Sequence, residues 1–104
     1  MTWEVVVEPA AERELRGAQD WYEAKRDGLG DLFIECIDEA IERITALPSA
    51  STPVPGVPTE LGARRVLVKK FPFTVVFIEH DAVIYVVAFA HSRRRPGYWL
   101  DRIH

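Results

Sequence analysis

The residues best suited to chemistry are basic and lie in the last part of the chain. Arg65 and Lys69 are four residues apart in a segment with the alternation of a strand, so both side chains should point to one face. Three consecutive arginines, Arg93, Arg94 and Arg95, follow the final apolar segment. Guanidinium and ammonium groups gathered in this way bind phosphates or carboxylates. The alternative is a solvated strand end with ordinary surface ion pairs.

Two large aromatic residues, Tyr98 and Trp99, follow the arginines in an otherwise polar tail. An exposed aromatic pair beside arginines is common in surfaces that recognise a partner. The preceding Pro96-Gly97 is a turn that would return the chain, so both rings could instead pack against a sheet.

The sequence has no motif typical of metal, cofactor or phosphate binding. His80, His91 and His104 are far apart, and the single cysteine, Cys36, lies on an apolar helix face, so we predict no metal site and no cofactor. Gly28-x-Gly30 follows a helical segment rather than a strand, which favours a turn over a phosphate loop.

The charges are segregated along the chain. Residues 1–63 carry 5 basic and 13 acidic side chains, and residues 64–104 carry 8 basic and 3 acidic ones, which gives −8 and +5 and the overall −3. This asymmetry indicates two surfaces with different partners.

The length of 104 residues and the 48% hydrophobic content predict one domain over residues 1–104 with one core. The chain has no apolar run of the roughly 20 residues that a membrane helix requires, and its start has no export signal. The lone cysteine suits a reducing compartment, so we expect a cytoplasmic protein without membrane contact.

Periodicity predicts the elements that carry these residues. Residues 3–8 are expected to be a strand, 9–26 and 30–47 two helices with Asp31 as a cap, and 48–63 a proline-rich loop. Strands are expected at 64–70, 73–79 and 83–90. The order β-α-α-β-β-β predicts an α+β fold, an antiparallel sheet with a helical hairpin on one face.

The predicted core follows from the same spacing. Val66 and Val68 should face the helices, which leaves Arg65 and Lys69 on the uncovered face. The residues expected to be largely buried are Leu15, Ala18, Tyr22, Phe33, Ile37, Ile41, Ile44, Val66, Val68, Val75 and Val86.

Two segments carry a family resemblance. VVAFAHSRRRPGYW, residues 86–99, resembles the C-terminal signature of the RelE/ParE toxins, and RRVLVKKFPFTVVF, residues 64–77, resembles their central hairpin. The predicted order of elements is also similar to that family, with ParE the nearer branch. The resemblance implies the toxin of a type II toxin–antitoxin system, bound and neutralised by a cognate antitoxin in a hetero-oligomer.

The resemblance implies two alternative activities on one fold. ParE-like members inhibit DNA gyrase, for which the target-binding candidates are Arg93, Arg94, Arg95, Tyr98 and Trp99. RelE-like members cut messenger RNA on the ribosome, and that activity would need cations, a base and an acid. The candidates for it are Arg65, Lys69, His91, Arg93 and Tyr98. A degenerate toxin that only binds its antitoxin is the third possibility.

Overall fold

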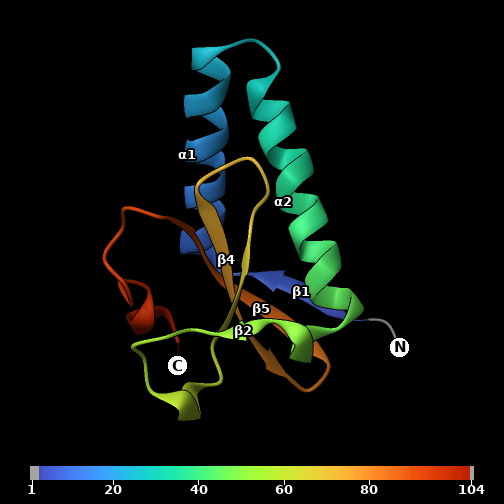
Figure 1. Ribbon diagram of the computed structural model, residues 1–104, viewed down its shortest axis with the longest axis vertical. Coiled ribbons are helices and arrows are strands. Elements are labelled where there is room, and N and C mark those ends of the chain that lie inside the picture. The colour runs from blue at the N-terminus through green and yellow to red at the C-terminus, as the bar shows by residue number, and fades with distance from the viewer. Residues whose placement is uncertain (1–2, 104) are drawn as a thin grey trace.

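The computed structural model describes residues 3–103, and its elements follow the predicted order closely. The chain runs through β1 (Glu4–Val7), α1 (Pro9–Lys25), α2 (Leu29–Ala46), β3 (Arg64–Leu67), β4 (Phe73–His80) and β5 (Val83–His91). Three short helical turns and one short strand lie in the loop and the tail: η1 (Pro48–Ala50), β2 (Thr52–Pro53), η2 (Thr59–Leu61) and η3 (Leu100–Arg102). The two long helices stand side by side as an antiparallel hairpin (Figure 1).

The sheet has the strand order β1-β5-β4-β3-β2. The last three predicted strands form the expected antiparallel meander, but β1 pairs with β5 in parallel, so the sheet is mixed rather than wholly antiparallel. Strand β2 was not predicted because its segment is rich in proline. It lies at the sheet edge, where a proline removes no ladder hydrogen bond that a neighbour needs.

The turn between the helices has a specific cause. Gly28 has a positive φ of 87° and is the cap of α2, so the prediction of Asp31 as the cap is wrong. The carboxylate of Glu23, from α1, accepts hydrogen bonds from the N–H groups of Gly28 and Gly30, at 2.9 and 3.0 Å. Gly28 therefore lies in the turn between the helices that the sequence predicted, and Gly30 lies in the first turn of α2, both held by a side chain of the first helix.

The main core lies between the helical hairpin and the sheet. Phe33, Ile37, Ile44, Val75 and Val86 are almost fully buried there, as predicted, and Val68 is 6% exposed. The other predicted core residues are half-buried and pack against this cluster: Leu15, Ala18, Tyr22, Ile41 and Val66.

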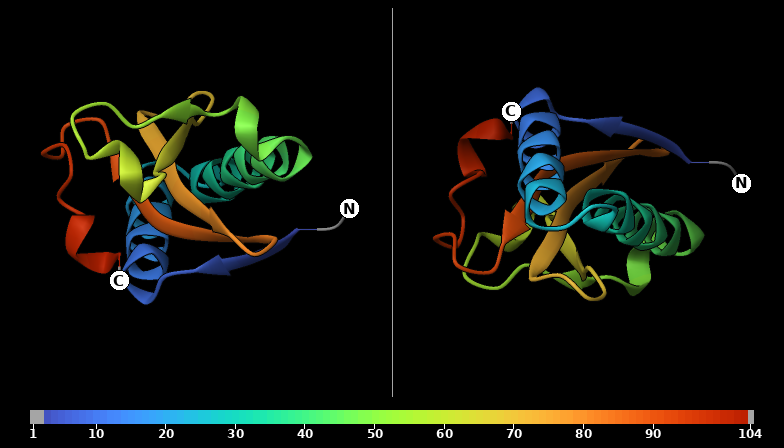
Figure 2. Two further views of the ribbon diagram at one scale, coloured as in Figure 1. Left: turned by 90° about the horizontal axis from the view of Figure 1, so that it is seen from below. Right: turned by 90° about the horizontal axis from the view of Figure 1, so that it is seen from above.

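A second core, which the sequence analysis did not predict, lies on the opposite face of the sheet. Val76, Val87 and Ala88 from β4 and β5 pack against Trp99, with side chains of the loop and tail around them. The sheet is thus covered by helices on one face and by the loop and the tail on the other. Figure 2 shows the loop and the tail together at the end of the molecule away from the N-terminus.

Candidate functional site

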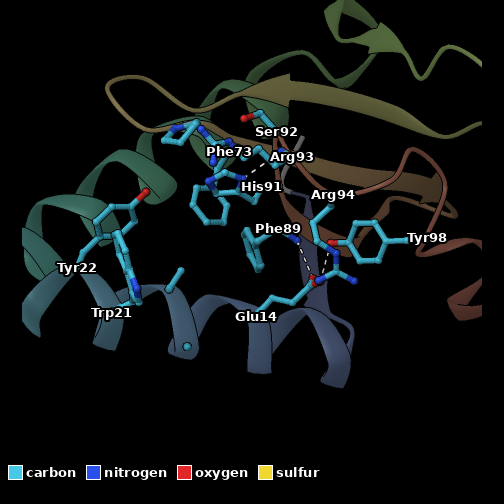
Figure 3. Close-up of a pocket in the computed structure, with 13 residues that line it drawn as sticks. Glu14, Trp21, Tyr22, Phe73, Phe89, His91, Ser92, Arg93, Arg94 and Tyr98 are labelled. Carbon is cyan, nitrogen blue, oxygen red and sulfur yellow. Dashed lines mark hydrogen bonds between the residues drawn. The ribbon is translucent and has the colours of Figure 1, made fainter.

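The C-terminal tail, residues 92–103, leaves β5 between two hollows. The first is an open groove of about 790 Å³ between α1 and the end of β5, called here the aromatic groove. Trp21, Tyr22, Phe73 and Phe89 line it, and Arg93 and Arg94 lie at its tail side (Figure 3). Apolar aromatic walls with cations beside them suit a partner segment that is apolar in the middle and acidic at its rim.

The second hollow is smaller, about 350 Å³, and is called here the basic pocket. Arg65 from β3 lies in it together with Arg94 and Arg95 from the tail, and Thr74 and Ser92 supply hydroxyl groups. Since Arg65 lies beside Val76 and Trp99 of the second core, its side chain occupies the sheet face that the helices do not cover, as predicted.

The four arginines that line the two hollows have no carboxylate partner within residues 3–103. In this described part of the chain, the side chains of Arg65, Arg93 and Arg95 make no hydrogen bond or ion pair, and Arg94 stacks on the ring of Tyr98. By contrast, other cations within residues 3–103 pair with glutamates: Arg16, Arg43, Lys69 and Arg102.

The prediction that Lys69 shares a face with Arg65 is wrong. Strand β3 ends at Leu67 and Lys70 has a positive φ of 68°, so the alternation of the strand stops before Lys69. Its Nζ lies 3.4 Å from the Glu39 carboxylate of α2, on the helix side. Burial acts to raise the pKa of Glu39, but hydrogen bonds and charge from Arg43 and Lys69 outweigh it and hold that pKa below its ordinary value.

Trp99 was expected to form an exposed pair with Tyr98, or to fold back. It is 3% exposed and anchors the second core, so the prediction of an exposed recognition residue is wrong for Trp99. The turn at Gly97, with φ of 77°, returns the chain to the sheet. Removal of the tail would uncover Val76, Val87 and Ala88, and single substitutions are therefore the proper test of the tail's role.

Tyr98 is half-buried at the edge of the aromatic groove. Its hydroxyl donates to Glu14 Oε2 at 2.5 Å, and the guanidinium carbon of Arg94 lies 3.8 Å from the centre of its ring. Burial, followed by the hydrogen bond to Glu14, raises the pKa of Tyr98 far above its ordinary value. The hydroxyl is therefore a bound proton donor and is poorly suited to act as a general base.

Four of the five residues suggested for RNA cleavage lie around the two hollows, and one lies apart. Arg65, His91 and Tyr98 line the basic pocket, His91, Arg93 and Tyr98 line the aromatic groove, and Lys69 lies on the helix side. His91 lines both hollows and its Nδ1 accepts a hydrogen bond from the Arg93 backbone N–H at 3.0 Å. Arg65 lies in the basic pocket, Lys69 is bonded to α2, and the Tyr98 hydroxyl is occupied by Glu14. In residues 3–103 no group of histidine, cysteine or acidic side chains has the geometry to hold a metal ion.

Glu14 and Arg102 are the residues that sequence reasoning missed. They form an ion pair at 2.9 Å with side chains only 16% and 17% exposed. One signal was available, since Glu14 lies between Ala11 and Ala18 on the buried stripe of α1, where a carboxylate requires a partner.

The chain has relatives of known structure and family. The family model described as "ParE toxin of type II toxin-antitoxin system, parDE" matches residues 5–96. A structure of the chromosomal ParDE toxin–antitoxin system from P. aeruginosa aligns at a TM-score of 0.70 and 17% identity, over 86% of this chain and 96% of the other. No sequence among curated proteins matches the chain.

A structure of the E. coli toxin RelE, a mutant with two arginines replaced by alanine, in the free state, aligns at a TM-score of 0.67 and 14% identity. The alignment covers 99% of this chain and 95% of that one. These two likenesses show the shared fold, and the family model shows the membership. None of the helices within residues 3–103 is long and apolar enough to cross a membrane. The chain belongs to the ParE toxin family of type II toxin–antitoxin systems.

Proposed function

We propose that this toxin inhibits DNA gyrase through the tail surface formed by Arg93, Arg94 and Arg95, together with Arg65. The carrying observation is that these four arginines gather around the two hollows beside the tail, where none of them pairs with a carboxylate within residues 3–103. A gyrase–DNA complex offers both phosphates and acidic protein surface, and an arginine fork fits either. In this surface the ring of Tyr98 stacks against the Arg94 guanidinium. The buried Trp99 instead packs the tail against the sheet.

RelE-like RNA cleavage is the second candidate, since Arg65 and His91 line one pocket. Tyr98 lines the same pocket, but its hydroxyl is bound to Glu14, and Lys69 lies apart on the helix side. The pocket therefore has no complete acid–base set, and gyrase inhibition is favoured.

Two assays with purified components distinguish gyrase inhibition from RNA cleavage. The intact protein should inhibit ATP-dependent supercoiling of a relaxed plasmid by gyrase, and should leave messenger RNA on translating ribosomes uncut. Cut messenger RNA with normal supercoiling would establish the RelE-like activity instead. If neither assay responds, and expression without the antitoxin leaves growth normal, the chain is a degenerate toxin.

The aromatic groove is the proposed docking site for the antitoxin. Trp21 is 57% exposed at this groove, which an apolar side chain of a partner would cover. Arg93 and Arg94 beside it would pair with acidic residues of the same segment. We expect this antitoxin segment to be disordered alone and to order on binding.

Co-expression with the product of the neighbouring gene should yield one complex in size-exclusion chromatography. Trp21→Ala should weaken that complex about thirtyfold or more, as loss of a central aromatic contact does. Leu47→Ala is the matched control, because Leu47 is 58% exposed at the far end of α2 and does not line the groove. Equal affinities of the two variants would place the antitoxin elsewhere.

A further inference from the structure

Glu14 is the point where the helical hairpin, the sheet and the tail are joined. Its carboxylate accepts hydrogen bonds from the Phe89 N–H at 3.2 Å and from the Tyr98 hydroxyl at 2.5 Å. It also accepts from both terminal nitrogens of Arg102, at 2.9 and 3.2 Å. A carboxylate with four donors from three residues, one in β5 and two in the tail, is held in one orientation.

The sheet explains why these donors are present. Strand β1 pairs with β5 only as far as Val86, and an irregularity in the β4–β5 register follows directly. Beyond that point, Arg102 donates to the Val87 carbonyl at 3.1 Å and Glu14 accepts from the Phe89 N–H. Buried backbone groups require hydrogen-bond partners. The ion pair supplies these partners to β5 where a longer first strand would otherwise have supplied them.

The same carboxylate determines where the Tyr98 ring lies, and the ring determines where Arg94 lies. The Arg94 guanidinium is stacked on this ring at 3.8 Å, and Arg102 approaches the same ring at 5.2 Å. Arg94 lines both the aromatic groove and the basic pocket, whereas Arg93 lines only the former and Arg95 only the latter. Figure 3 shows Glu14 reaching from α1 toward Tyr98, with Arg94 beside the ring.

We infer that Glu14 is a positioning residue of the tail: through the Tyr98 ring it holds the Arg94 guanidinium between the two hollows, where it can bind a carboxylate or phosphate group of the target. The use of Arg94 in target binding rests on the proposed function, but its placement by Glu14 does not. A stacked guanidinium retains its hydrogen-bonding edge for a ligand while its face is supported. Pre-ordering of this side chain reduces the entropy that binding must overcome.

Nuclear magnetic resonance of the free protein tests the placement directly. The Arg94 Nε–H proton should show a ring-current shift in the wild type, calibrated by its loss in Tyr98→Leu. In Glu14→Gln, which preserves shape but removes the charge, at least half of that shift should disappear. Glu12→Gln is the matched control, because Glu12 is on the same helix and pairs with the exposed Arg16. An unchanged Arg94 shift in Glu14→Gln would overturn the inference.

A second variant distinguishes a loss of Arg94 positioning from a loss of folding. Tyr98→Phe keeps the ring and removes the hydroxyl that Glu14 holds, so it should reduce the same shift while the methyl resonances of Ile37 and Val75 stay in place. A wild-type Arg94 shift in folded Tyr98→Phe also contradicts the inference.

The functional arm uses gyrase supercoiling. Glu14→Gln should raise the concentration required for half inhibition about tenfold, and Glu12→Gln should not change it. Full inhibitory potency in a Glu14→Gln protein that has lost the Arg94 shift would overturn the role of this placement in binding. A wild-type protein with no effect on gyrase would overturn the proposed function. The Arg94 chemical shift would still test, independently, whether Glu14 positions the Arg94 guanidinium.

Discussion

At the scale of single residues, the Tyr98 hydroxyl proton is bound where several charges meet. Glu14 accepts it, Arg102 pairs with the same carboxylate, and Arg94 covers the ring. Burial and Glu14 raise the pKa of Tyr98, while the charges of Arg102 and Arg94 act to lower it. The Tyr98 hydroxyl therefore binds its proton more strongly in the folded state than in the unfolded chain.

This gives a pH dependence of stability. A group whose pKa is raised on folding stabilises the protein below its unfolded value, about 10 for tyrosine, and loses that contribution as the pH rises further. The urea-determined free energy of unfolding should therefore decrease from pH 8 to pH 10.5, and it should decrease less in Tyr98→Phe. Parallel decreases in the two proteins would show that the Tyr98 proton has no such role.

Two tryptophans provide a matched test of burial. Trp99, 3% exposed, fills the second core, and Trp21, 57% exposed, lies on α1 against Tyr22 and Lys25. Trp99→Ala should cost about 3–5 kcal/mol in unfolding free energy, and Trp21→Ala less than about 1 kcal/mol. Comparable losses would mean that the tail does not pack as described.

At the scale of elements, glycine has two different uses in the hairpin. A methyl group added at Gly30 would lie 2.8 Å from the backbone oxygen of Gln19, because the helices approach closely there. A methyl group at Gly17, within α1, would meet nothing within 4 Å.

The two glycine-to-alanine substitutions should therefore have opposite effects. Gly30→Ala should destabilise the protein by about 1–3 kcal/mol through overpacking. Gly17→Ala should stabilise it by about 0.5–1 kcal/mol, because alanine favours a helix interior. Thermal unfolding would measure both, and a loss of stability in Gly17→Ala would contradict the open surface described for α1.

The elements could be predicted from the sequence because their signals are local. Pro9, the Gly28 turn and the alternation of Val66 and Val68 each act within a few residues. The parallel pairing of β1 was not predictable from its three valines, since strand direction depends on the path of the whole chain. Lys69 was misplaced because β3 ends at Leu67 and Lys69 lies in the turn that follows, next to the positive φ of Lys70.

At the scale of the whole molecule, the charge segregation in the sequence becomes a spatial one. Arg65, Arg93, Arg94 and Arg95 line the two hollows beside the tail and meet no carboxylate within residues 3–103, and Arg102, from the same half, is neutralised by Glu14. The candidate arginines could be found from their spacing, but the pairing of Glu14 with Arg102 could not. These two residues are 88 positions apart and meet only because the second core folds the tail back onto α1.

The central claim is that Arg93, Arg94 and Arg95 of the tail, together with Arg65, inhibit gyrase, and one matched comparison tests it most directly. Supercoiling by purified gyrase would be measured with wild type, Arg94→Ala and Arg26→Ala at increasing toxin concentration. Arg26 is an exposed arginine that caps α1 at the helical turn, so its loss removes the same charge elsewhere. The turn between the two helices lies far from the tail (Figure 1).

Arg94→Ala should require roughly thirtyfold more protein for half inhibition, the effect of losing one central contact of about 2 kcal/mol, while Arg26→Ala should match the wild type. Equal inhibition by all three proteins would contradict the account.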